Sequence, residues 1–365
     1  SRVYGCYVNS SREIIAYIDQ SLGLMPQEEA EKYLGLLKKA LSGTLGRNLI
    51  DIVFSPQQVA DSEEHRLLSA LRTSELKDAE ARDAFYQQVI GSLDMGENNY
   101  LILLGADAYD VPHRGKDGEV DRDACEEVFR YFVCCVCPVK DGTPELGYFH
   151  GENEFHISME KQIVGQPELG FLFPAFDDRT ANLYNALFYS RKPDELHQEF
   201  IDAVFRTEPP MSAAEQRETF QSALCGTLEG ACSMEVVQSV HDYLRQRIQE
   251  HKESRDPEPL AVTAGEVSGV LRNCGVPEER VEAFQTACGQ SFGEGALTPA
   301  NLIDAKHFAV KTADATIQVD PERSYLVEAR IIDGRRYLLV PADESVEVNG
   351  LGVRIAAAKD GGETT

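Results

Sequence analysis

The sequence predicts an α+β protein with a mixed or mainly antiparallel sheet and packed helices, then a helical segment and a small C-terminal β module. Strand-like runs dominate residues 1–157, whereas helical periodicity dominates residues 179–250, and regular strand–helix alternation stops after the first third of the chain. Towards the C-terminus the hydrophobic period falls to two, which is typical of short strands with one solvated face.

The first half of the chain is predicted to interleave strands and helices. Alternating apolar residues indicate strands, and apolar residues three or four apart indicate helices. The first segments are an opening hairpin at 3–18, a helix from Pro26 to Gly43 and a strand at 49–54. They are followed by one helix that starts at residue 61, a second helix at 78–93, and strands at 100–104, 128–139 and 148–157. The polar segment 111–123 between two of these strands is predicted to be a loop.

The second half is predicted to begin with four helices, at 179–189, 193–205, 213–228 and 234–251. Segment 251–260 is charged and contains two prolines, so we expect a linker there. This linker would follow a core domain of residues 1–250. Beyond it we expect a helical pair at 261–305, a small β module at 306–355 with a hairpin turn at Asp333-Gly334, and a disordered tail at 356–365.

Composition excludes several classes of protein. The 365 residues carry a net charge of −26, which disfavours binding of the acidic whole to nucleic-acid backbones or anionic lipid. No apolar run approaches the length of a membrane span, so we expect no membrane partner. Nine dispersed cysteines indicate reduced thiols and a cytoplasmic protein, with Cys134, Cys135 and Cys137 packed in a buried strand.

A cluster of metal-ligand residue types occurs at 150–156. On a continuous strand His150, Glu152, Glu154 and His156 share one face, and imidazoles with carboxylates are ligands of divalent metals. A straight strand separates His150 from His156 by roughly 20 Å, so only neighbours such as Glu154 and His156 are expected to bind one ion. The alternative is an edge strand with a solvated polar face.

A second candidate site is the run Asp177-Asp178-Arg179. Its carboxylates suit general acid–base chemistry or a metal, and its arginine suits a phosphate. Together with the 150–156 cluster it supports an alternative function as a metal-assisted hydrolase or phosphoryl-transfer enzyme. The simpler interpretation is that Asp177 or Asp178 caps the helix predicted to follow.

Four arginines gather in the predicted C-terminal β module, and they are Arg323, Arg330, Arg335 and Arg336. They are the one local excess of positive charge, and they leave open a contact with an anionic partner. On this basis a nucleic-acid-associated or ribosome-associated factor is a further alternative. The competing interpretation is an ordinary charged strand surface.

Several stretches resemble one known family. Residues 2–9 (RVYGCYVN), 41–52 (LSGTLGRNLIDI), 170–179 (GFLFPAFDDR), 214–221 (AEQRETFQ) and 321–338 (PERSYLVEARIIDGRRYL) are similar to an uncharacterised bacterial family, mainly from Firmicutes, the domain of unknown function numbered 4317. The resemblance implies a bacterial intracellular protein and carries over no activity. Because no catalytic pattern is complete, we expect a non-catalytic binding or scaffold protein with a protein partner and no cofactor, while an enzyme stays open.

Overall fold

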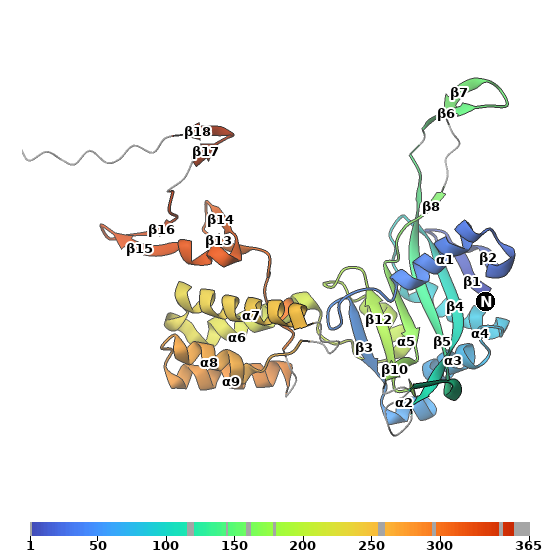
Figure 1. The fold of residues 1–365 in the computed structure, drawn as a ribbon, viewed down its shortest axis with the longest axis horizontal. Helices are drawn as coiled ribbons and strands as arrows, with labels where there is room; N and C mark the ends of the chain where they lie inside the picture. Colours follow the sequence, from blue (N-terminus) through green and yellow to red (C-terminus); the bar gives the residue numbers. More distant parts are fainter. Residues whose placement is uncertain are drawn as a thin grey trace, which may run out of the picture. The chain divides into compact units, whose positions relative to one another are not determined.

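The computed structural model describes residues 2–114, 120–143, 145–157, 162–177, 180–254, 260–293, 297–342 and 346–353, with the backbone alone at 110–114, 120–127, 177 and 180. The chain divides into two compact units, Ser1–Gln216 and Arg217–Thr365, called here the N-terminal and C-terminal units. A large antiparallel sheet, helices and small C-terminal hairpins confirm the predicted α+β class (Figure 1).

The N-terminal unit is built on an antiparallel sheet with the strand order β2-β1-β4-β5-β9-β12-β3, and β8 also pairs with β5. Its strands are β1 (Arg2–Val8), β2 (Ile14–Ser21), β3 (Leu49–Val53), β4 (Asn99–Arg114), β5 (Val120–Asp141), β8 (Gln162–Val164), β9 (Leu169–Phe173) and β12 (Asn185–Ser190). The opening hairpin, formed by β1 and β2, is confirmed. The central strands are the most apolar ones, as expected for strands with neighbours on both sides.

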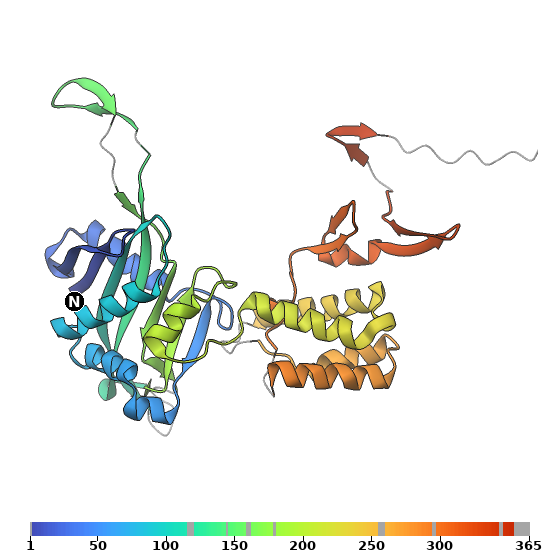
Figure 2. The same cartoon turned by 180° about the vertical axis from the view of Figure 1, so that it is seen from behind.

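Helices cover both faces of this sheet. One face packs against α3 (Glu63–Thr73), α4 (Ala79–Ser92) and α5 (Gln198–Phe205), and the other against α1 (Gln27–Lys39) (Figures 1 and 2). The shorter elements α2 (Pro56–Asp61) and η1 (Leu22–Leu24) complete this part. In β5, Phe132, Cys134 and Val136 belong to the first core, and alternate residues 133, 135 and 137 belong to the second. The run of apolar residues in β5 is therefore buried on both faces, as predicted.

A glycine sets how closely α1 approaches the sheet. A Cβ atom at Gly170 in β9 would lie 2.8 Å from the Cβ of Ala40 and 2.5 Å from the backbone oxygen of Cys134. Real Cβ atoms do not approach other atoms so closely, so only glycine permits this contact. The helix ends at Lys39 with Ala40 as its C-cap, earlier than the predicted end at Gly43.

Several predictions within the N-terminal unit are wrong. The described parts of segment 111–123 are strand and not loop, because β4 and β5 pair as far as Arg114 and Val120. The predicted helix at 179–189 is replaced by the strands β10 (Ala175–Asp177), β11 (Thr180–Asn182) and β12. Pairing of β12 between β9 and β3 overrides the apolar spacing that indicated a helix. The predicted helix at 193–205 begins only at Gln198.

The C-terminal unit begins with a group of helices. They are α6 (Ala213–Leu228), η2 (Glu229–Ala231), α7 (Met234–Ser254), α8 (Ala264–Asn273), α9 (Glu278–Phe292) and α10 (Pro299–Leu302). Phe220 of α6, Leu244 of α7, Leu271 of α8 and Phe284 of α9 share one core. The sequence assigned the helices at 213–250 to the first domain, whereas the structure packs them with the helical pair. The division at Gln216 and Arg217 thus differs from the predicted linker at 251–260, of which 255–259 lie outside the described residues.

The predicted small C-terminal β module consists, in its described residues, of three two-stranded hairpins. They are β13 (Phe308–Lys311) with β14 (Thr316–Val319), β15 (Glu328–Ile332) with β16 (Arg335–Leu339), and β17 (Val346–Val348) with β18 (Leu351–Val353), and η3 (Pro321–Leu326) lies among them. Positive φ angles at Asp333 and Gly334 confirm the predicted turn. The predicted disordered tail lies outside the described residues. Among the described helices, none has the length and apolar composition needed to cross a bilayer.

Candidate functional site

The cluster at 150–156 lies in a small hairpin of the N-terminal unit. The predicted continuous strand at 148–157 is instead two strands, β6 (Leu146–Phe149) and β7 (Glu154–Ile157), joined by a turn. Asn153 takes a positive φ of 57°, and its backbone N–H donates to the carbonyl of Phe149 at 2.8 Å. The hydroxyl of Tyr148 also donates to the side chain of Asn153. The turn therefore reverses the chain where the sequence had suggested a straight strand.

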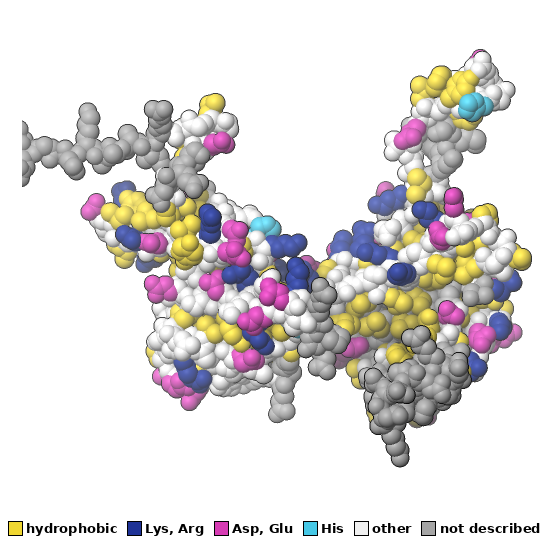
Figure 3. All heavy atoms as spheres, in the orientation of Figure 1, with side chains coloured by type: hydrophobic (Ala, Val, Ile, Leu, Met, Phe, Trp, Pro, Cys, Tyr) yellow, Lys and Arg dark blue, Asp and Glu magenta, His cyan; other side chains and the backbone are white. Residues whose placement is uncertain are grey.

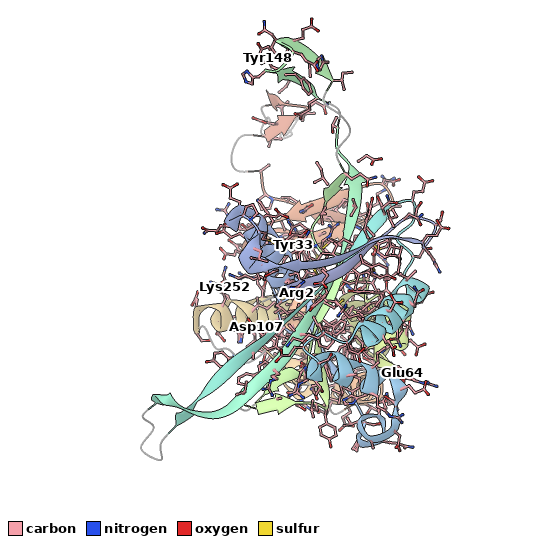
Figure 4. The ribbon with its side chains drawn as sticks, turned by 90° about the vertical axis from the view of Figure 1, so that its right-hand side faces the viewer. Arg2, Tyr33, Glu64, Asp107, Tyr148 and Lys252 are labelled. Carbon is pink, nitrogen blue, oxygen red and sulfur yellow. The ribbon has the colours of Figure 1, made fainter. Side chains whose placement is uncertain are left out.

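One face of the β6–β7 hairpin is apolar. The register places Leu146 opposite Ile157 and Tyr148 opposite Phe155, so all four side chains share one face. Their exposed fractions are 70% for Leu146, 68% for Ile157, 67% for Phe155 and 40% for Tyr148. Figure 3 shows these apolar side chains in yellow on the hairpin, and Figure 4 labels Tyr148. We call this surface the apolar hairpin face.

The opposite face carries Glu154 and His156 together with the aromatic ring of Phe149. The Nε2 atom of His156 lies 2.8 Å from the carboxylate of Glu152, and the imidazole ring lies 4.2 Å from the ring of Phe149. Glu154 pairs with Phe149 in the register, whereas His150 lies in the turn with its ring against Tyr148. Glu154 and His156 therefore share one face of β7, as expected for this pair, whereas His150 and Glu152 lie in the turn and not on that strand. Within the part of the chain that the structure describes, no three His, Cys, Asp or Glu side chains form a metal-binding group.

Asp177, the first residue of the second candidate run, ends β10 and pairs through its backbone with Thr180 of β11. The strands β11 and β12 take the place of the helix that this run was predicted to cap. Asp178 and Arg179 lie outside the described residues. The proposed convergence of this run with the 150–156 cluster thus stays a prediction.

The hairpin formed by β15 and β16 divides its arginines, with Arg330 and Arg335 on one face and Arg336 on the other. Arg335 and Arg336 are neighbours in β16 and therefore point to opposite faces. Arg330 of β15 binds Glu328 at 2.5 Å, which neutralises much of its charge. Arg323 lies in η3, before this hairpin.

A polar cleft that the sequence did not indicate lies beside β1 and β4. It has a volume of about 290 Å³ and is lined in part by Arg2, Tyr4, Glu75, Lys77 and Asp107. Figure 4 labels Arg2 and Asp107 on these neighbouring strands. Lys77 lies 2.6 Å from Glu75 and lowers the pKa of that carboxyl group by donating a hydrogen bond. Residues so distant in sequence meet only because β1 and β4 pair.

The cations of this cleft are already neutralised. The guanidinium of Arg2 lies 2.6 Å from the carboxylate of Asp19. The hydrogen bond that the guanidinium donates to this carboxylate raises the pKa of Arg2. Such exposed ion pairs contribute little to stability, and they reduce the attraction that the cleft exerts on an anionic ligand. The apolar hairpin face is therefore the more distinctive surface of the N-terminal unit.

The fold and this hairpin define a two-unit α+β protein with an exposed apolar hairpin and with no assembled metal centre among its described residues. A family model matches residues 1–351, and the chain belongs to that family, described as a domain of unknown function (DUF4317). This confirms the resemblance found in the sequence. Comparison with the curated proteins and with the solved structures gave no match.

Proposed function

We propose that this chain is a non-catalytic, cytoplasmic bacterial protein that binds a partner protein through the apolar hairpin face. The observation that carries the proposal is the exposure of Leu146, Tyr148, Phe155 and Ile157 on one side of a two-stranded hairpin. Contiguous exposed apolar side chains that are rimmed by polar residues mark interaction sites on soluble proteins. Burying each such side chain in a partner contributes about 1.5–3 kcal/mol.

The isolation of the hairpin supports the same proposal. Among the described residues β6 and β7 pair only with each other. A two-stranded hairpin is marginally stable in water when nothing covers it. A partner that covers the apolar face would stabilise the hairpin and gain binding free energy from the same contacts.

The charge of the hairpin indicates which kind of partner surface it can bind. The hairpin segment 145–157 carries Glu145, Glu152 and Glu154 and contains no lysine or arginine. Anionic lipid and nucleic-acid backbones would be repelled by these carboxylates. The complementary surface is an apolar protein groove with lysine or arginine at its rim.

The test is capture of partners by the tagged full chain from a lysate of its own bacterium, with and without nuclease. We expect wild-type protein to retain a partner that Phe155→Ser retains about tenfold less, which corresponds to about 1.4 kcal/mol of binding free energy. The matched control is Ile331→Ser, since Ile331 is 74% exposed on a different hairpin. Equal retention by wild type and Phe155→Ser would contradict the proposal.

A second measurement does not depend on the stability of a variant hairpin. A photo-crosslinking amino acid in place of Tyr148 should link the partner, whereas the same group in place of Glu154 on the opposite face should not. Capture that nuclease abolishes would instead support the nucleic-acid alternative. A metal-dependent rise in melting temperature that His156→Ala removes would support the enzyme alternative.

A further inference from the structure

Two cysteines of the C-terminal unit lie close enough to react with each other. Cys225 is in the last turn of α6, and Cys232 follows η2 as its C-cap residue. Their Sγ atoms are 3.8 Å apart, Cys225 is exposed and Cys232 is partly exposed. The chain turns at η2 between them, and a small approach of the two side chains brings the sulfurs to bonding distance.

The only comparable pair among the described cysteines is chemically different. The Sγ atoms of Cys135 and Cys137 are 3.9 Å apart, but both side chains are completely buried in β5. Residues two apart in a strand are roughly 6.6 Å apart along it, at the upper end of the range in which a disulfide forms, and their burial keeps both thiols away from a dissolved oxidant. The hydrogen bond between the two thiols and their burial raise the pKa of Cys135 well above its usual value. This pair serves as an internal control.

We propose that Cys225 and Cys232 form a reversible disulfide when the protein meets a small-molecule disulfide such as oxidised glutathione. The Cys225 thiolate attacks one sulfur of the small disulfide, which gives a mixed disulfide and releases one small thiolate. The Cys232 thiolate then attacks the Cys225 sulfur, closes the protein disulfide and releases the second small thiolate. The two cysteines lose two electrons and two protons, and the small disulfide becomes two thiols.

The solvent exposure of the two thiols determines which of them reacts first with the small disulfide. Cys225 is the more exposed thiol, so it meets the oxidant first. Burial, together with the hydrogen bond that it shares with Cys225, raises the pKa of Cys232 to about 11. Cys232 is therefore mostly protonated near neutral pH, and ring closure should become faster as pH rises towards that value.

The disulfide would join the end of α6 to the start of α7. Cys225 precedes the 3-10 turn at 229–231 and Cys232 precedes the first residue of α7 by two positions. Both helices contribute to the core of the C-terminal unit. Oxidation would thus fix the connection between two helices of this core, which makes the site a redox-sensitive element separate from the apolar hairpin face.

The sequence allows a direct test, because trypsin releases residues 218–245 as one peptide that contains both cysteines. The reduced full chain is incubated with oxidised glutathione, alkylated and digested. We expect this peptide to be two hydrogens lighter than the reduced peptide and free of alkyl groups, and dithiothreitol to reverse the change. Cys135 and Cys137 should stay reduced and become alkylated only after unfolding.

Single variants test the order of the steps. Cys232→Ser should accumulate glutathione on Cys225, and Cys225→Ser should accumulate neither a disulfide nor an adduct at the rate seen for wild type. The proposal is overturned if the wild-type peptide 218–245 stays doubly alkylated after treatment, or if it forms the disulfide no faster than urea-unfolded protein does. Either result leaves the hairpin proposal untouched, since that proposal is measured on other residues.

Discussion

Strand β5 and the β6–β7 hairpin are two apolar β segments close together in the chain, yet the apolar side chains of β5 are mostly buried and those of the hairpin are exposed. In β5, Phe132 and Cys135 are fully buried, because helices cover both faces of the sheet. In the hairpin, Phe155 and Ile157 are about two-thirds exposed, and β6 and β7 pair only with each other among the described strands. Apolar composition therefore indicates a strand, whereas the burial of that strand depends on which other elements pack against it.

This difference separates stability from binding. A buried aromatic side chain stabilises the folded chain because folding removes it from water. An exposed one contributes little to folding and keeps its apolar surface for a partner. Substitutions that reduce the same kind of side chain in the two regions should therefore have different consequences.

We expect Phe171→Ala to reduce the stability of the N-terminal unit most strongly, and Phe155→Ala is the variant to compare with it. The ring of Phe171 in β9 is fully buried and lies 5.0 Å from that of Phe205 and 5.6 Å from that of Phe132. Its loss should reduce the free energy of unfolding of the N-terminal unit by about 3–5 kcal/mol. Phe155→Ala should change it by less than about 0.5 kcal/mol. Urea-dependent hydrogen exchange of peptides from β9 measures both, and equal losses would contradict the contrast.

A smaller effect is expected where an exposed residue acts through hydrogen bonds. Thr263 caps α8, since its hydroxyl accepts a hydrogen bond from the backbone N–H of Glu266 and the Glu266 carboxylate accepts one from the backbone N–H of Thr263 at 2.7 Å. This second bond lowers the pKa of Glu266. Thr263→Ala should destabilise the C-terminal unit by about 1 kcal/mol, and Thr263→Ser should restore most of it. Hydrogen exchange in α8 measures the change, and an unaltered rate for Thr263→Ala would show that the cap is unimportant.

The smallest effect at neutral pH is expected at His197, whose contribution changes with pH. This residue precedes α5 with a φ of 50°, and the structure gives its buried Nε2 atom no hydrogen-bond partner. Burial lowers the pKa of the imidazole, so the folded state holds the neutral form while the unfolded state binds a proton near its ordinary pKa of about 6.5. The stabilising contribution is therefore present above about pH 6.5 and is lost as pH falls towards the lowered pKa.

The variant His197→Asn removes this titration and keeps a residue that tolerates positive φ. Wild type should lose more melting temperature than His197→Asn when the pH falls from about 7.5 to about 5. Melting curves at matched pH values provide the measurement. Parallel losses in the two proteins would mean that His197 takes no part in the acid response.

Elements that depend on local interactions could be predicted from the amino-acid sequence. The opening hairpin, the buried runs of β4 and β5, helices α6 to α9 and the Asp333-Gly334 turn all follow from periodicity, capping and turn residues close together in the chain. The sequence also shows which residues around 146–157 are polar and which are apolar. It does not show which of them share a face of the hairpin, because the turn at 150–153 changes that arrangement.

Features that depend on segments far apart in the sequence could not be predicted in this way. Pairing with β9 and β3 made a strand of residues 185–190, and a shared core joined α6 and α7 to the C-terminal helices. The polar cleft beside β1 and β4 arises in the same way, because its lining residues Arg2, Lys77 and Asp107 are far apart in the sequence. Local propensities differ by only about 1 kcal/mol per residue, so the burial and pairing supplied by remote segments decide such cases.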